Sequence, residues 1–106
     1  MSKYMLMASL KPEAIQGIMK EGGSGRKHYV ENFIKEAGGT LESFYYAFGE
    51  TDVFVVADMP DVPTVTAFAM AINSSGLVSV RTIPLITPEE VDAATKKRIK
   101  YRAPGQ

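Results

Sequence analysis

The stretch Glu21–Tyr29, EGGSGRKHY, holds the residues whose types and spacing best suit the binding of a ligand. Three glycines around Ser24 let successive backbone N–H groups converge near a helix start, where the helix dipole favours an anion, and Arg26 and Lys27 add positive charge. It is not a Walker loop, because the Gly-Lys-Ser/Thr ending is missing. The alternative is a flexible helix kink with surface cations. We expect a small carboxylate or phosphate to bind at Gly22, Gly23, Ser24, Gly25, Arg26 and His28.

His28 and Asp52 are the candidate catalytic bases. His28 is the single His of the chain, and an imidazole suits proton transfer near neutral pH. Asp52 ends the turn Gly49–Asp52. The alternatives are a solvated His on a charged helix turn and an Asp that bonds nearby turn amides. The chain has no Cys, no nucleophile with an adjacent base and no dinucleotide fingerprint, so we expect neither a metal nor a cofactor.

Tyr46 and Arg81 complete the expected ligand site. Tyr45 and Tyr46 alternate along one predicted strand, so only one of them points into a cleft between sheet and helices. The alternative for either ring is a core position with a satisfied hydroxyl. Arg81 lies inside another predicted strand, where an unpaired Arg is seldom buried, so we expect it to pair with Asp52, with Asp58 or with a ligand.

The elements that must position these side chains follow from apolar periodicity and from helix start and stop signals. The predicted strands are Lys3–Leu10, Thr40–Phe48, a run from Val53 that Pro60 stops, and Val78–Ile86. The predicted helices begin at Pro12, after a cap at Ser24, after a cap at Asp61 and at the capping box Thr87–Glu90. Along Thr40–Phe48 the two expected faces are Phe44, Tyr46 and Phe48 against Leu41, Tyr45 and Ala47.

This order of elements predicts an α+β, ferredoxin-like fold. It is strand, broken helix, strand, strand, helix, strand and a C-terminal helix, which is the split βαβ pattern with one antiparallel sheet and its helices on one side. Right-handed crossovers leave few other arrangements. The length suits a single domain, residues 1–106, of which residues 87–106 form a C-terminal helix and tail.

The predicted strands are apolar on both faces. A sheet covered by helices on one side should carry polar residues on the other, yet Met5, Met7, Phe54 and Val56 occupy those alternate positions. Covering several such side chains supplies about 5 to 10 kcal/mol before the cost of association. We therefore predict a homodimer that packs sheet to sheet through the helix-free face. Asp52 and Asp58 mark the strand ends and oppose further edge pairing.

Charge and hydropathy disfavour nucleic acid and membranes as partners. Twelve basic residues balance twelve acidic ones, so no overall field attracts nucleic acid or anionic lipid, and no nucleic-acid partner is expected. The apolar N-terminal stretch, Tyr4–Leu10, is too short to cross a bilayer and has no small-residue cleavage site after it. We expect a cytoplasmic protein without a membrane partner.

The segment FGETDVFVVADMP, together with Lys-Pro-Glu after the first strand, Gly-Gly before the second, Arg81-Thr82 and a late Thr-Pro-Glu-Glu-Val-Asp, resembles the GYD domain family of small bacterial proteins. The resemblance covers almost the whole chain and implies a dimeric α+β barrel of the ferredoxin-like group. Gly49 and Asp52 match the family's Gly-x-Tyr-Asp pattern, whereas Thr51 replaces the Tyr, so no role of that ring carries over.

The sequence is compatible with three functions. The first is a dimeric module that binds a small anionic metabolite between sheet and helices. The second is a cofactor-free isomerase or monooxygenase, by analogy with other dimeric barrels, with His28 or Asp52 as base. The third is a structural self-association domain whose C-terminal helix and tail hold a second subunit.

Overall fold

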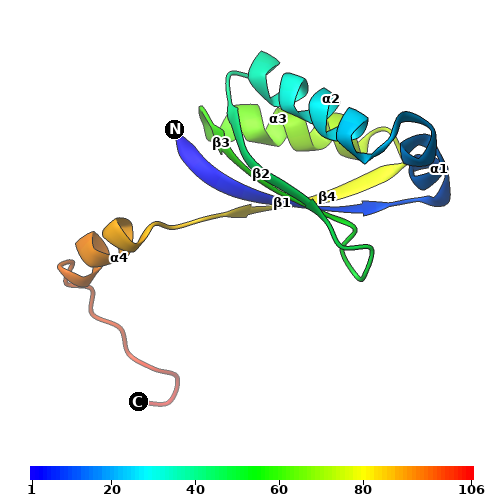
Figure 1. Ribbon diagram of the computed structural model, residues 1–106. Coiled ribbons are helices and arrows are strands. Elements are labelled where there is room, and N and C mark those ends of the chain that lie inside the picture. Colours follow the sequence, from blue (N-terminus) through cyan, green and yellow to red (C-terminus); the bar gives the residue numbers. More distant parts are fainter.

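The computed structural model describes residues 1–106 and contains one four-stranded sheet and four helices (Figure 1). The strand order is β2-β3-β1-β4, and every neighbouring pair is antiparallel. This is the predicted α+β, ferredoxin-like arrangement. In chain order the elements are β1 (Ser2–Leu10), α1 (Pro12–Glu21), α2 (Gly23–Glu36), β2 (Thr40–Tyr46), β3 (Val53–Met59), α3 (Val62–Asn73), β4 (Val78–Pro84) and α4 (Pro88–Thr95).

The core lies between the sheet and the helices α2 and α3, which cover the same face of the sheet (Figure 1). The register places Tyr4 opposite Ala57 and Leu6 opposite Val55, so alternate residues of β1 and β3 point toward the helices. The helices contribute Ile34, Val65 and Phe68, which are buried against these strand residues. The remaining core residues are Val53 and Met59.

The first helix is broken at Gly22, as predicted. Gly22 has a φ of 82°, which L side chains rarely adopt, and α1 ends and α2 begins on either side of it. The prediction that Ser24 caps the second helix is wrong: Gly22 is the N-cap, no side chain caps this end, and Ser24 lies exposed within the first turn. Asp61 and the Thr87–Glu90 capping box are confirmed as caps.

A β-bulge corrects the predicted faces of β2. The register shifts between Leu41 and Ser43, which leaves Glu42 as the extra residue. Leu41 therefore faces the core together with Phe44 and Tyr46 instead of sharing a face with Tyr45. The strand ends at Tyr46, because Phe48 has a φ of 52° and turns the chain.

The C-terminal segment extends away from this body (Figure 1). The fourth strand ends at Pro84 rather than Ile86, and every residue from 88 to 106 is exposed. The radius of gyration is 17.0 Å, whereas a compact domain of this length has about 13 Å. We call residues 86–106 the C-terminal arm. None of the helices, α4 included, has the length and apolar character needed to cross a membrane.

Candidate functional site

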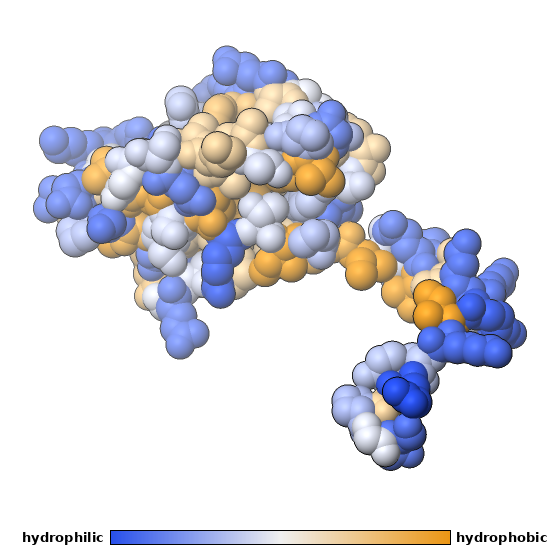
Figure 2. Space-filling model, turned by 180° about the vertical axis from the view of Figure 1, so that it is seen from behind, coloured by the Kyte–Doolittle hydropathy of each residue, from blue (hydrophilic) through white to orange (hydrophobic).

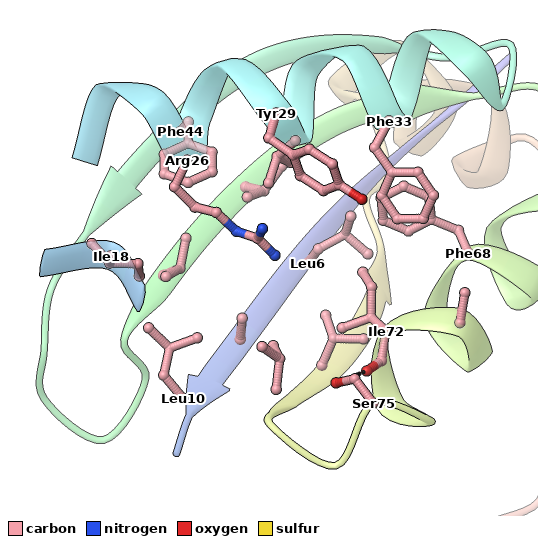
Figure 3. A pocket seen from close by; sticks show the side chains of 17 residues that line it. Leu6, Leu10, Ile18, Arg26, Tyr29, Phe33, Phe44, Phe68, Ile72 and Ser75 are labelled. Atoms are coloured by element: carbon pink, nitrogen blue, oxygen red, sulfur yellow. Dashed lines mark hydrogen bonds between the residues drawn. The ribbon is translucent and has the colours of Figure 1, made fainter. Parts of the chain in front are cut away.

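A cavity of about 320 Å³ lies between the sheet and the helices (Figure 3). Of its 17 lining residues, 15 are hydrophobic, and the two others are Arg26 and Ser75. Such a largely apolar cavity with few polar groups is typical of a small-molecule site. The apolar lining residues are Leu6, Ala8, Leu10, Ile18, Tyr29, Val30, Phe33, Phe44, Val53, Val55, Phe68, Ala71, Ile72, Val78 and Val80.

The cavity exists because α2 and α3 touch at one end and separate toward the other. The rings of Phe33 and Phe68 stack with their centroids 4.4 Å apart and close one end of the space. Ile18, from α1, lies at the opposite end, and β1 and β3 run beneath (Figure 3). The break at Gly22 lets α1 turn away from α2, and this turn places Ile18 on the lining.

Arg26 is the one charged residue of the lining. Its guanidinium lies 4.8 Å from the centre of the Tyr29 ring and points into the cavity (Figure 3). Its nearest acidic group is Glu21, whose Oε1 lies 3.9 Å from the Arg26 Nε, too far for a hydrogen bond. The Arg26 side chain is 37% exposed. Its N–H donors are therefore accessible to an anion that enters the cavity.

Tyr46 fixes the first turn of α2 and does not line the cavity. Its hydroxyl donates a hydrogen bond of 3.0 Å to the Gly23 carbonyl oxygen. A Cβ on Gly23 would lie 3.3 Å from the Tyr46 ring, so the glycine permits this close contact. Burial raises the pKa of the Tyr46 hydroxyl, while the nearby positive charge of Arg26 opposes the rise. The hydroxyl consequently stays protonated at neutral pH and remains a donor.

The other members of the predicted anion site lie outside the cavity. Gly22, Gly23, Ser24 and Gly25 are absent from its lining, and the turn does not converge on it. His28 is exposed, and its Nε2 lies 3.3 Å from the Asn32 amide nitrogen. Of the residues expected around Glu21–Tyr29, the structure therefore brings only Arg26 to a cavity.

Asp52 holds two strands together. Its Oδ2 accepts a hydrogen bond of 2.7 Å from the backbone N–H of Leu10, and its own N–H donates to the Ala8 carbonyl oxygen. The carboxylate thus satisfies the last residue of β1, where the ladder with β3 has ended. Asp52 also lies outside the cavity, which has no carboxylate and no imidazole on its lining.

Arg81 and Asp58 lie on the helix-free face of the sheet. Arg81 is opposite Met7 in the register and is exposed, so it does not reach the cavity. The predicted pairing of Arg81 with Asp52 or Asp58 is wrong. Asp58 lies inside β3, one residue before the strand ends, and pairs with Lys3, whose Nζ also contacts Glu42 at 2.6 Å. Hydrogen bonds raise the pKa of the Lys3 ammonium group. The bond to Glu42 has the largest effect, and the bond to Asp58 has the next largest.

The apolar lining is the part of the site that the sequence did not indicate. Val30 and Phe33 recur at helical spacing in α2, and Phe68 and Ile72 do so in α3, as core residues do. This pattern does not distinguish a filled core from a hollow one. The available signal was Arg26, a cation within the same helix as Val30 and Phe33 and at the spacing that shares their face.

Comparison with known proteins supplies the family and no more specific relative. The model of the GYD domain matches residues 4–95. No curated protein and no solved structure gives a significant match. The matched region includes every residue of the cavity and all of the sheet except the first two residues of β1, and it bears out the resemblance of the FGETDVFVVADMP segment. The chain therefore belongs to the GYD domain family.

Proposed function

We propose that this protein binds a small anionic molecule in the cavity between the sheet and the helices, with Arg26 as the anchor. The observation that carries the proposal is the position of Arg26: it is the one charged group on a lining that is otherwise almost entirely apolar. The site differs from the predicted one, because the glycine turn and His28 take no part in it.

The environment of Arg26 favours pairing of its guanidinium with an anion over hydration of the guanidinium by water. A guanidinium next to apolar walls loses part of its hydration, and Glu21 at 3.9 Å compensates this loss weakly. A carboxylate or phosphate accepts two parallel hydrogen bonds from a guanidinium in the planar geometry that Arg presents. The surrounding apolar side chains exclude water and strengthen that pairing.

The enzymatic alternative has no base in this cavity. His28 and Asp52, its two candidates, both lie elsewhere, and the titratable side chains on the lining are Arg26 and Tyr29. The geometry of the cavity therefore supports ligand binding more than acid–base catalysis, and we propose no reaction for this site.

Replacing Arg26 with Gln is expected to weaken binding of an anion at least about tenfold, because it removes a charge-assisted pair. The measurement is an amide NMR titration with benzoate, phenyl phosphate, acetate and inorganic phosphate. The matched control is Lys27→Gln, which removes the same charge from the neighbouring, exposed position and should leave affinity within about twofold. Absence of shifts at cavity residues with all four anions, or equal effects of the two variants, would contradict the proposal.

We further propose that the protein is a homodimer through its helix-free face. Met5, Met7, Phe54 and Val56 form the centre of that face and are only half-buried in the single chain, while Tyr45 is 70% and Ile83 39% exposed. Figure 2 shows apolar residues along the sheet side of the body and again on the projecting arm. An apolar face of this extent is unusual on an isolated chain.

Self-association through the C-terminal arm is a second candidate function, favoured by its exposure. The arm leaves Ile86, Val91, Ile99 and Tyr101 exposed by 71%, 49%, 86% and 81%. It extends away from the body and is exposed from residue 88 to residue 106, so it contributes little to the folded core (Figure 1). A second copy of the chain is the partner that we propose, because the arm projects toward the helix-free side of the sheet (Figure 1), where it can contact the rim of a second copy that packs face to face.

Deleting the residues after Thr87 is expected to weaken dimerisation about tenfold, because the apolar side chains of the arm lose their contact with the second copy. Sedimentation equilibrium measures the dissociation constant, and circular dichroism checks that the sheet and the three remaining helices persist. An unchanged dissociation constant would show that the arm has no part in self-association.

A further inference from the structure

We infer that the ligand of the cavity is an apolar monocarboxylate, with a straight-chain or single-ring body of about ten non-hydrogen atoms. The inference rests on the proposed anion site at Arg26 and specifies what that site accepts. Three features of the cavity carry it: the polarity of its lining, its volume and the position of Arg26 relative to the Phe33–Phe68 stack.

The lining accommodates one charge and little other polarity. Apart from Arg26, the polar groups on it are the Ser75 hydroxyl and the Tyr29 hydroxyl. A second carboxylate, or the several hydroxyls of a sugar phosphate, would lose hydration against apolar side chains without gaining partners. A single carboxylate on a hydrocarbon body leaves no polar group unpaired.

The volume sets the size of the body. A cavity of about 320 Å³ lies at the small end of the range of about 300 to 1,000 Å³ that small-molecule sites occupy, which suits a body of about ten non-hydrogen atoms. Octanoate and cinnamate have about this number of non-hydrogen atoms, whereas acetate fills a small part of the space. A ligand much larger than this must leave part of its body in water.

The geometry orients the ligand along α2. Arg26, Tyr29 and Phe33 lie on the same side of this helix, and Figure 3 shows Tyr29 between the guanidinium and the stacked rings of Phe33 and Phe68. Seven residues of helix span about 10 Å. The carboxylate therefore pairs with Arg26, and the apolar body lies over β1 and points toward the Phe33–Phe68 stack.

A series of straight-chain carboxylates tests the inference. Butanoate, hexanoate, octanoate and decanoate are titrated into the full-length protein below their micelle concentrations, and dissociation constants are taken from NMR shifts or calorimetry. Affinity is expected to rise about fourfold with each methylene up to octanoate and to level off at decanoate. 1-Octanol, which lacks the charge, should bind at least about tenfold more weakly than octanoate.

A cavity-filling variant keeps the test independent of Arg26. Ala71 is on the lining and exposed, so Ala71→Leu places a larger side chain in the opening without removing a core contact. It should weaken octanoate at least about tenfold. Ala67→Leu, one turn earlier on the exposed side of α3 and off the lining, is the matched control and should leave octanoate binding unchanged.

The outcomes separate this inference from the proposed function. Binding of phosphate or succinate at Arg26 as tightly as octanoate, with no gain per methylene, would overturn the apolar class and leave the anion site in place. Equal effects of Ala71→Leu and Ala67→Leu would also overturn it, because the body would then lie outside the cavity. If none of these anions shifts the lining residues, both the inference and the proposed function fail.

Discussion

Replacing Gly39 with Ala is expected to lower the free energy of unfolding by about 3 kcal/mol, a large part of the 5 to 15 kcal/mol that is typical of a domain. A Cβ at this position would lie 2.5 Å from the Asp58 carbonyl oxygen, 2.8 Å from the Met59 sulfur and 3.1 Å from Ile34 Cγ2. The carbonyl is backbone within β3, so the strand or the end of α2 must shift. Met59 and Ile34 are fully buried and cannot move aside into solvent.

The matched control for Gly39→Ala is Gly25→Ala. Gly25 lies in the first turn of α2, where the nearest atom to an added Cβ is the Glu21 Cβ at 3.9 Å, an ordinary contact. Because Ala favours a helix over Gly, this variant should be neutral or gain up to about 1 kcal/mol. Urea unfolding of both variants measures the difference. Equal stability of Gly39→Ala and the unaltered protein would contradict the close packing of Gly39, just after α2, against β3.

Replacing Val56 with Glu is expected to weaken the proposed dimer at least about a hundredfold. Val56 lies near the middle of the helix-free face, opposite Met5 on β1. In a two-fold symmetric interface the same patch meets itself, so two new carboxylates would approach each other and lose water without a cation between them. Sedimentation velocity across micromolar concentrations should show a dimer for the unaltered protein and single chains for the variant.

Val56→Thr is the matched control, because it keeps the β-branched shape and adds no charge. It should stay a dimer at the same concentrations, and the circular dichroism of both variants should match that of the unaltered protein. Single, folded chains of the unaltered protein at micromolar concentration would contradict the dimer, as would a dimer that the Glu substitution leaves intact.

The fold could be predicted because its signals are local. The short apolar runs of β1 and β3, the caps at Asp61 and Thr87 and the glycine break at Gly22 act over a few residues, and the structure contains each of these elements. The order of these elements then admits few topologies. The order of motifs resembles that of the GYD family and implied the same fold. The family match over residues 4–95 confirms this resemblance.

The site was predicted less well, because its residues meet through contacts between elements. Arg26 was identified by its charge, but the glycines beside it serve a different purpose: Gly23 makes room for the Tyr46 ring from β2. Arg81 was assigned to the wrong face because a strand's periodicity gives two faces without saying which one meets the helices. Leu41 was assigned to the wrong face for a different reason: the extra residue of the bulge at Glu42 shifts the alternation of the strand by one position.

The sequence by itself determined the elements, their order, the family and the presence of apolar residues on both faces of the sheet. The tertiary structure decided that α2 and α3 meet at Phe33 and Phe68 and then separate, which turns part of an apparent core into a cavity with Arg26 inside it. The physical reason is that hydrophobic patterning specifies which side chains leave water, whereas the angle between packed helices decides how completely they fill the space they share.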